Sequence, residues 1–176
     1  IQDILGPEWR VAASVGHVRD MPVKRIAVSA PDFKPEYEDT ERGADVLRRL
    51  AGMVKSADEV YLATDPDREG EAIAWHLSEA LRLKSPKRVT FDSITEAPIK
   101  AAIAAPRTID MDLVRAQEAR RVLDRFCGYL VSGPLSSVSG TKMSAGRVQS
   151  PATRMIVERE RAIRAFTSTT HYGAEF

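Results

Sequence analysis

Three carboxylates, Asp65, Asp67 and Glu69, stand two residues apart in one short segment. Like charges this close repel one another, and each makes its neighbours harder to ionise. A bound cation would explain why they are confined to one place. All three are oxygen ligands, which favours Mg²⁺ or another hard ion over zinc. An alternative stays open, because acids here can also cap a helix and interact with its positive end.

The flanking residues predict that this segment follows a strand. Residues 59–64 are apolar or β-prone and indicate a buried strand. Pro66 and Gly70 then indicate a tight turn, and apolar residues from Ala72 to Leu81 recur at helical spacing. Open α/β sheets bind ligands just past the carboxyl ends of their strands. The three acids are therefore expected where such a sheet would hold a ligand.

Residues 65–77 read D-P-D-R-E-G-E-A-I-A-W-H-L, which closely resembles the acidic motif in the Toprim domain of type IA DNA topoisomerases. The resemblance implies that Asp65, Asp67 and Glu69 hold the Mg²⁺ that this family needs for religation and relaxation. Asp65 is the first choice for direct ligation. Arg68 is expected to screen the acids or hold a phosphate. These four residues are the predicted catalytic set.

A second segment, residues 16–22, reads G-H-V-R-D-M-P and is similar to the family's G-H-x-R-D-L-P segment. The resemblance implies that His17 lies near the active site, and we expect it to contact DNA. The residues by themselves favour a polar turn with an exposed histidine. His76, in the predicted helix after the acids, is expected to be half-buried and hydrogen-bonded, with a role as a ligand or base as the alternative.

Residues 116–129 place two arginines and an aromatic ring on one face of a predicted helix. Arginine can hold phosphates and tyrosine can stack on a base, so this face suits a single-stranded nucleic acid. An ordinary solvated face, with a charge network among its Arg and Asp residues, remains open. The segment also resembles the A-Q-x-A-R-R-x-x-D-R-x-x-G-Y helix that lines the DNA groove of type IA topoisomerases. The predicted DNA-binding residues are Arg120, Arg121, Asp124, Arg125 and Tyr129.

Residues 144–150 read S-A-G-R-V-Q-S and resemble another motif of the same family. Gly146 allows the main chain to approach a phosphate closely, and Arg147 and Gln149 can bond to phosphate or base. Ser144, Arg147 and Gln149 complete the predicted DNA-binding set.

The remaining pattern predicts an α/β fold with a Toprim-type parallel sheet flanked by helices, because strands and helices alternate. Strands are expected at residues 9–14 and 87–91, and helices at 41–55 and 96–105. A further helix, capped by Asp110 or Asp112, is expected to run to about Leu130. Residues 131–143, rich in Ser and Gly, are expected to form a loop. Ser150 is expected to cap a last helix with Pro151 in its first turn, and Met155, Ile156, Ile163 and Phe166 to face a core. A strand is expected from Thr167.

Composition and charge change near residue 106. Residues 1–106 carry 15 basic and 18 acidic residues, a net charge of −3, whereas residues 107–176 carry 11 and 7, a net charge of +4. Such asymmetry points mildly to an acidic partner for the second part. We expect a Toprim domain at 1–106, lacking its first strand by comparison with the family, and the first part of a helical DNA-binding domain at 107–176.

Composition also bounds the cellular setting. The apolar share of 43% is sufficient for a real core. The single cysteine, Cys127, excludes an internal disulfide and a cysteine-cluster zinc site, and fits a reducing cytoplasm. No apolar run approaches the length of a membrane span. We expect a cytoplasmic, nucleoid-associated protein.

The resemblance implies an N-terminal fragment of an enzyme that relaxes negatively supercoiled DNA. Such enzymes cleave one strand through a 5′-phosphotyrosine and reseal it with Mg²⁺, and the partners would be single-stranded DNA and the remaining domains of the parent chain. None of Tyr37, Tyr61, Tyr129 and Tyr172 lies in the family's tyrosine motif, so the chain alone is not expected to cleave DNA. Two alternatives remain: a Mg²⁺-binding Toprim module of another nucleic-acid enzyme, and a non-catalytic DNA-binding module.

Overall fold

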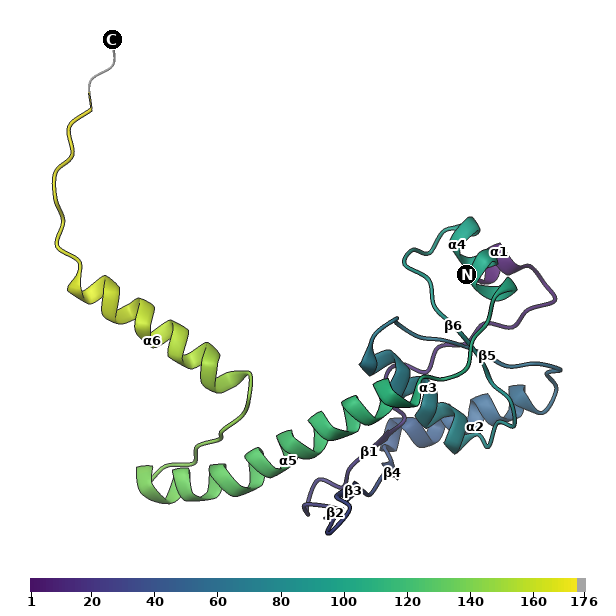
Figure 1. Cartoon of the computed structure of the whole chain (residues 1–176), viewed down its shortest axis with the longest axis horizontal. Helices are drawn as coiled ribbons and strands as arrows, with labels where there is room; N and C mark the ends of the chain where they lie inside the picture. The colour runs from purple at the N-terminus through teal and green to yellow at the C-terminus, as the bar shows by residue number, and fades with distance from the viewer. Residues whose placement is uncertain (174–176) are drawn as a thin grey trace. The chain divides into compact units, whose positions relative to one another are not determined.

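The computed structural model describes residues 1–173. Main-chain contacts divide the chain into two compact units, Ile1–Leu123 and the part from Asp124 onward. None of the helices within residues 1–173 combines the length and apolarity needed to cross a membrane. The elements in chain order are α1 (Gln2–Leu5), β1 (Arg19–Asp20), β2 (Val28–Ser29), β3 (Lys34–Pro35), β4 (Glu38–Asp39), α2 (Glu41–Val54), β5 (Tyr61–Ala63), α3 (Arg68–Ala80), β6 (Lys87–Val89), α4 (Glu96–Ala104), α5 (Met111–Ser139) and α6 (Gln149–Ala165) (Figure 1).

The first unit is built around a parallel pair of strands, which confirms the predicted α/β class. β5 pairs with β6 in register from Tyr61 opposite Lys87 to Ala63 opposite Val89. The two short antiparallel pairs, β1 with β4 and β2 with β3, lie in the segment before α2. A parallel connection needs a crossover, and α3 supplies it between β5 and β6.

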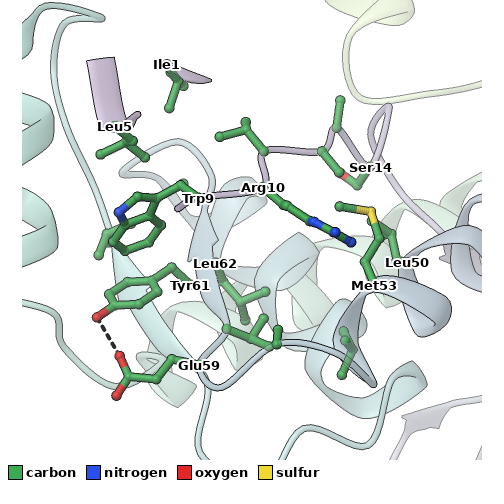
Figure 2. Close-up of a pocket in the computed structure, with 18 of the residues that line it drawn as sticks. Ile1, Leu5, Trp9, Arg10, Ser14, Leu50, Met53, Glu59, Tyr61 and Leu62 are labelled. Atoms are coloured by element: carbon green, nitrogen blue, oxygen red, sulfur yellow. Dashed lines mark hydrogen bonds between the residues drawn. The ribbon is translucent and has the colours of Figure 1, made fainter. Parts of the chain in front are cut away.

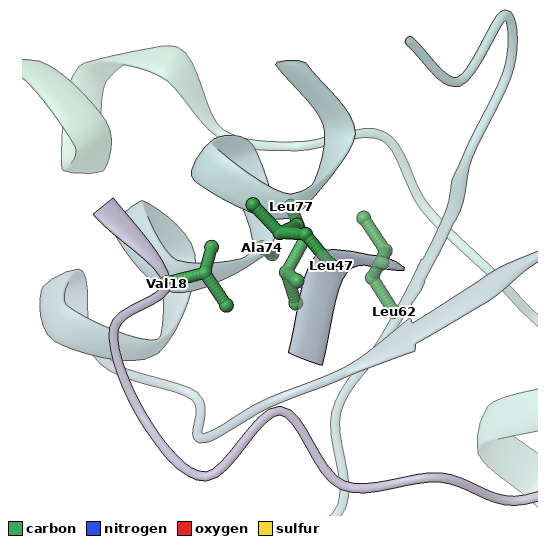
Figure 3. Close-up of a cluster of buried hydrophobic side chains, with 5 residues drawn as sticks. All are labelled: Val18, Leu47, Leu62, Ala74 and Leu77. Atoms are coloured by element: carbon green, nitrogen blue, oxygen red, sulfur yellow. The ribbon is translucent and has the colours of Figure 1, made fainter. Parts of the chain in front are cut away.

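The core of this unit joins α2 and α3 to β5. Val18, Leu47, Leu62, Ala74 and Leu77 form one cluster of buried side chains, which Figure 3 shows converging from four segments. Because the apolar stripe of each helix meets the same strand, α3 is fixed relative to the end of β5. The acidic segment lies between β5 and α3, so this core fixes both of its ends.

A cavity of about 1050 Å³ lies beside β5 and is lined mainly by apolar side chains. Figure 2 shows Leu5, Trp9 and Tyr61 on its wall. The Trp9 and Tyr61 rings meet edge to face, with 5.0 Å between the ring centres. Within residues 1–173, β5 pairs with β6 alone. Its other edge therefore has no strand partner in this part of the chain.

The strand predicted at residues 9–14 was wrong. These residues do not pair with another strand. A side chain instead makes hydrogen bonds to some of their main-chain N–H and C=O groups. Gln2 donates from Nε2 to the Trp9 carbonyl at 2.8 Å and accepts from the Val11 N–H at 2.9 Å. One glutamine thus replaces two bonds that a neighbouring strand would make.

The loop predicted at residues 131–143 was also largely wrong, because α5 continues to Ser139. Of the two predicted caps, Asp110 is the one that caps α5, accepting from the Asp112 and Leu113 N–H groups. Near the other end, the Ser136 and Ser137 hydroxyls donate to carbonyls four residues earlier. Hydroxyls bonded in this way fit a helix, so serine content alone was a poor loop signal. Pro134 lies inside α5.

Three expectations for the last segment differ from the structure. α6 begins after Val148, so Ser150 is not its cap, although Pro151 does lie in the first turn. The four apolar residues expected to face a core are more than half exposed: Met155, Ile156, Ile163 and Phe166. No strand forms between residues 167 and 173, and residues 174–176 lie outside the described part.

Candidate metal centre and nucleic-acid interface

We call residues 64–70 the acidic turn. It comprises the connection from β5 to α3 and the first three residues of α3. α3 already begins at Arg68, and its N-cap is Asp67, whose Oδ1 accepts from the Gly70 N–H at 2.7 Å. Capping of this kind satisfies one of the N–H groups that a helix start leaves unpaired. The capping alternative is therefore confirmed for Asp67. The turn predicted to reach Gly70 is shorter than expected, because the cap starts the helix earlier.

Gly70 is required by a close main-chain approach. A Cβ atom at this position would lie 2.2 Å from the Asp65 carbonyl oxygen. The Thr64 hydroxyl also donates to the Gly70 carbonyl at 2.6 Å. These contacts fold the acidic turn back on the first turn of α3, so Asp65 and Asp67 leave the same tight loop.

Unlike Asp67 and Glu69, Asp65 makes no hydrogen bond or ion pair through its side chain within the described residues. The residue is exposed. Arg68 is exposed as well. The structure thus holds the main chain of Asp65 in a tight turn and leaves both carboxylate oxygens available.

Glu69 is held by two partners from distant parts of the chain. Its Oε1 lies 2.5 Å from His17 Nε2, and its Oε2 accepts from Gln117 Nε2 at 3.3 Å. Desolvation by burial would raise the pKa of Glu69, but the hydrogen bonds from His17 and Gln117 outweigh it and lower the pKa. Glu69 is therefore an ionised group that joins the 16–22 segment, the acidic turn and α5.

The described residues hold no group of three His, Cys, Asp or Glu side chains arranged to bind a metal ion. Mg²⁺ commonly takes only one or two protein carboxylates and completes its shell with water or phosphate oxygens. Asp65 with both oxygens available, and Asp67 with the oxygen that does not cap α3, fit that chemistry. Glu69 fits less well, because both of its oxygens already have partners.

A buried charge network that was not predicted lies directly behind the acidic turn. The side chains of Glu71 and Arg88 are fully buried, and Arg88 Nε donates to Glu71 Oε2 at 3.0 Å. Arg107 donates to both oxygens of Glu71, and the Asp110 N–H donates to Oε1 at 2.6 Å. Desolvation opposes ionisation, yet these donors lower the pKa of Glu71 to about 2. One signal was available: an arginine in the middle of a strand of an α/β sheet needs a partner if the strand is buried.

His76 is more buried than predicted and lacks the expected hydrogen bond at one nitrogen. It is 2% exposed, and its Nδ1 has no partner among the described residues. The His76 ring meets the Tyr37 ring edge to face, with 4.4 Å between the ring centres. Burial is the largest influence on its pKa, followed by the charges of Arg19 and His17, and together they lower the pKa to about 4. His76 is therefore neutral at pH 7.

On α5, the predicted DNA-binding face begins at the acidic turn. Gln117 is 2% exposed and bonds to Glu69, as described above. Arg121 forms an ion pair with Asp20 of the 16–22 segment, and Arg120 is partly buried. The alternative of a solvated face placed Arg121 in a charge network with Asp124 and Arg125, but the carboxylate that pairs with Arg121 comes from another segment.

In the second unit, the predicted DNA-binding residues pair with one another. Arg147 contacts Asp124 at 2.9 Å, and the Arg125 guanidinium lies 5.5 Å from the centre of the Tyr129 ring. The Ser144 hydroxyl donates to Gln149 Oε1 at 3.3 Å. The segment 144–150 is also tied to α5, since the Ala145 N–H donates to the Ser132 hydroxyl. All six residues keep part of their surface open to solvent.

Two protein-family models match the chain, one over the part with the acidic turn and one over the part with α5 and α6. The Toprim domain model matches residues 1–94, and a DNA topoisomerase model matches residues 108–175. The chain belongs to the bacterial type IA DNA topoisomerase family. This confirms the family to which the four sequence segments pointed.

Topoisomerases from several bacteria align with nearly the whole chain. A plasmid DNA topoisomerase I of Xylella fastidiosa is 62% identical over 174 residues, which are 99% of this chain and 26% of that protein. DNA topoisomerase 1 of Streptomyces coelicolor is 46% identical over 98% of this chain and 20% of its own length. The full-length topoisomerase I structure from Thermotoga maritima matches with a TM-score of 0.81 and 42% identity, covering 94% of this chain and 29% of that one. The chain thus spans about a quarter of the length of these topoisomerases.

Proposed function

We propose that this chain supplies the metal site and part of the single-strand groove of an enzyme that relaxes negatively supercoiled DNA. In that reaction one strand is cleaved through a 5′-phosphotyrosine and resealed with Mg²⁺. One observation carries the proposal: the hydrogen bond from Gln117 to Glu69 joins the proposed DNA-binding helix directly to the acidic turn. A metal bound at that turn would stand beside a strand lying along α5.

Asp65 and Asp67 are the residues proposed to hold Mg²⁺, with Arg68 close by to screen the acids or hold a phosphate. Bound there, the ion would offset negative charge at the phosphate that is cleaved and resealed. Glu69 is proposed to act as an ionised acceptor that orients His17 and Gln117. This division of roles follows from the partners of each carboxylate.

Two of the arginines that we propose to contact DNA are already oriented by carboxylates. Arg121 pairs with Asp20 and Arg147 with Asp124, and both arginine side chains remain 41% exposed. A guanidinium held by one carboxylate can still offer donors to a phosphate, because it carries five N–H groups. The aromatic face of Tyr129 would stack on a base. The other proposed contacts are His17, Arg120, Arg125, Ser144 and Gln149.

The domain boundary near residue 106 and the cellular location are also proposals. A boundary between 1–106 and 107–176 is supported by the family models, which leave residues 95–107 between them. A cytoplasmic, nucleoid-associated location is what the family relationship suggests.

Cleavage is proposed to need a tyrosine outside these 176 residues. Tyr37 and Tyr61 both donate their hydroxyls to carboxylates, Glu118 and Glu59 respectively. Burial, followed by the charge of Glu118, raises the pKa of Tyr37, which opposes formation of a nucleophilic phenolate. A covalent DNA adduct formed by the chain alone would contradict this proposal.

The metal site can be tested with Mn²⁺, a paramagnetic substitute for Mg²⁺. Electron paramagnetic resonance measures how much Mn²⁺ stays free as it is titrated into the protein. Asp65→Asn is expected to weaken Mn²⁺ binding at least about 10-fold, a loss that even residues behind the ligands can cause. Asp67→Asn is expected to weaken binding while keeping the helix cap, because asparagine caps as well as aspartate. Asp58→Asn, an exposed acid before β5, is the matched control.

Equal Mn²⁺ affinity in the wild-type chain, Asp65→Asn and the control would contradict a metal site at the acidic turn. The non-catalytic DNA-binding module would then be the better reading, provided that single-stranded DNA still binds.

A further inference from the structure

Arg88 is the largest side chain in the described part of the protein that is fully buried. It stands in the middle of β6, where its main chain pairs with Leu62. Burial of a guanidinium removes a strongly hydrated charge from water, which is unfavourable unless the charge is paired and its N–H groups are satisfied. Glu71 supplies the counter-charge. The remaining donors show where the side chain is directed.

Nη1 donates to the Leu62 carbonyl of β5 at 3.2 Å and to the Val89 carbonyl of β6, and both terminal nitrogens also reach the main chain of the acidic turn. Nη1 donates to the Thr64 carbonyl at 2.8 Å, and Nη2 donates to the Asp65 carbonyl at 2.7 Å. The strand pairing of β5 ends at Ala63, opposite Val89. Thr64 and Asp65 therefore lie just past the last paired residue, and the guanidinium takes the place of a strand partner for their carbonyls.

We propose that Arg88 is a positioning residue for the metal site, because its guanidinium fixes the main chain of Asp65 from behind while the Asp65 carboxylate faces outward without a partner. The same Asp65 carbonyl lies so close to Gly70 that a Cβ atom there would be 2.2 Å from it, so the turn also leaves no room for a side chain at position 70. A ligand whose backbone is fixed and whose side chain is uncommitted needs little rearrangement to meet an ion. This inference rests on the proposed function, in which Asp65 binds Mg²⁺.

The geometry requires the arginine fork in particular. One planar group reaches Glu71 with Nε and, with its two terminal nitrogens, the successive carbonyls of Thr64 and Asp65 as well as carbonyls of β5 and β6. A lysine presents a single ammonium at one point and cannot span these acceptors together. Glu71 completes the arrangement, because its other partners, Arg107 and the Asp110 N–H, connect the same network to the start of α5.

Arg88→Lys tests the role, with Arg107→Lys as a matched control. Arg107 bonds to the same Glu71, but its other acceptor is the Thr108 carbonyl and not the acidic turn. Both variants are expected to melt at lower temperature than the wild-type chain. At a temperature where circular dichroism shows each chain folded, Arg88→Lys is expected to bind Mn²⁺ about 10-fold more weakly, and Arg107→Lys is expected to bind as the wild type does.

The outcomes separate the two proposals. If Mn²⁺ binds the wild type and Arg88→Lys equally well, Arg88 only supports the fold and the positioning role is overturned while the metal site stands. If Arg107→Lys loses as much affinity as Arg88→Lys, general loosening explains the result and the role is also overturned. If the wild-type chain does not bind Mn²⁺, the proposed metal site fails and the positioning role fails with it.

A second measurement avoids the risk that Arg88→Lys does not fold. In the wild-type chain, the ¹⁵N and ¹H resonances of the Arg88 guanidinium can be followed during a Mg²⁺ titration. They are expected to shift with the same midpoint as the main-chain amides of Asp65 and Asp67, while the Arg107 guanidinium shifts little. Arg88 resonances that stay unchanged at saturating Mg²⁺ would overturn the inference.

Discussion

At the scale of single residues, burial separates acids that the motif sets at equal spacing. Asp65, Asp67, Glu69 and Glu71 follow one another every two residues, yet the first three are exposed and Glu71 is fully buried. The spacing therefore predicted where the carboxylates cluster but not which of them faces water. That depends on Arg88 and Arg107, which are 17 and 36 residues away in the sequence. No local pattern carries that information.

His76 gives a prediction about the pH dependence of stability. Its pKa is about 4 when folded and about 6.5 in an unfolded chain, because burial and the neighbouring charges of Arg19, His17 and Arg121 outweigh the opposing charge of Asp20. The unfolded state therefore takes up the proton first as the pH falls below 6.5. The free energy of unfolding is expected to fall by about 2 kcal/mol between pH 7 and pH 5.

Urea unfolding at both pH values, in the wild type and in His76→Leu, measures this effect. The variant is expected to lose most of the difference between pH 7 and pH 5. The depressed pKa values of Glu69 and Glu71 place their titration below this window. An unchanged pH dependence in His76→Leu would show that another group is responsible.

At the scale of elements, α2 and α4 were predicted to within one residue at both ends, whereas the starts of α3 and α6 and the end of α5 were missed. α2 and α4 begin where expected, and α5 begins after its Asp110 cap, because caps and first turns are local features. Even so, Thr95 precedes α4 without making a side-chain cap bond. The end of α5 was missed because its serine hydroxyls bond to the helix itself. The strand expected at residues 9–14 was lost to a contact from the side chain of Gln2.

The cap of α3 gives a prediction at this scale. Asp67→Ala removes the bond to the Gly70 N–H, and the free energy of unfolding is expected to fall by about 1 kcal/mol. Asp67→Asn keeps an acceptor at the same place, so its free energy of unfolding is expected to fall by only a few tenths of the loss in Asp67→Ala. Urea unfolding at pH 7 distinguishes them. An equal loss in the two variants would mean that the charge of Asp67, and not its cap, stabilises α3.

At the scale of the whole molecule, the resemblance located the family but not the surfaces left open. The family models and relatives confirm the assignment made from four short segments. The apolar cavity beside β5 and the exposed apolar residues of α6 were not foreseen. Both depend on which elements pack together, and periodicity shows only that a face is apolar. The net charge of +4 over residues 107–176 remains consistent with an acidic partner.

The central claim is that the acidic turn and α5 together form a site for single-stranded DNA. Fluorescence anisotropy of a labelled single-stranded oligonucleotide, titrated at two salt concentrations, tests it most directly. The chain is expected to prefer single strands over duplex. Arg121→Ala is expected to weaken binding and to reduce the slope of log affinity against log salt by about 0.7, the value for one phosphate contact on a single strand.

Arg115→Ala is the control, because Arg115 stands on the same helix, is 71% exposed and pairs with Asp112. It is expected to change the affinity much less. No binding to single strands at low salt, or equal losses in Arg121→Ala and Arg115→Ala, would contradict a DNA site at the junction of the acidic turn and α5.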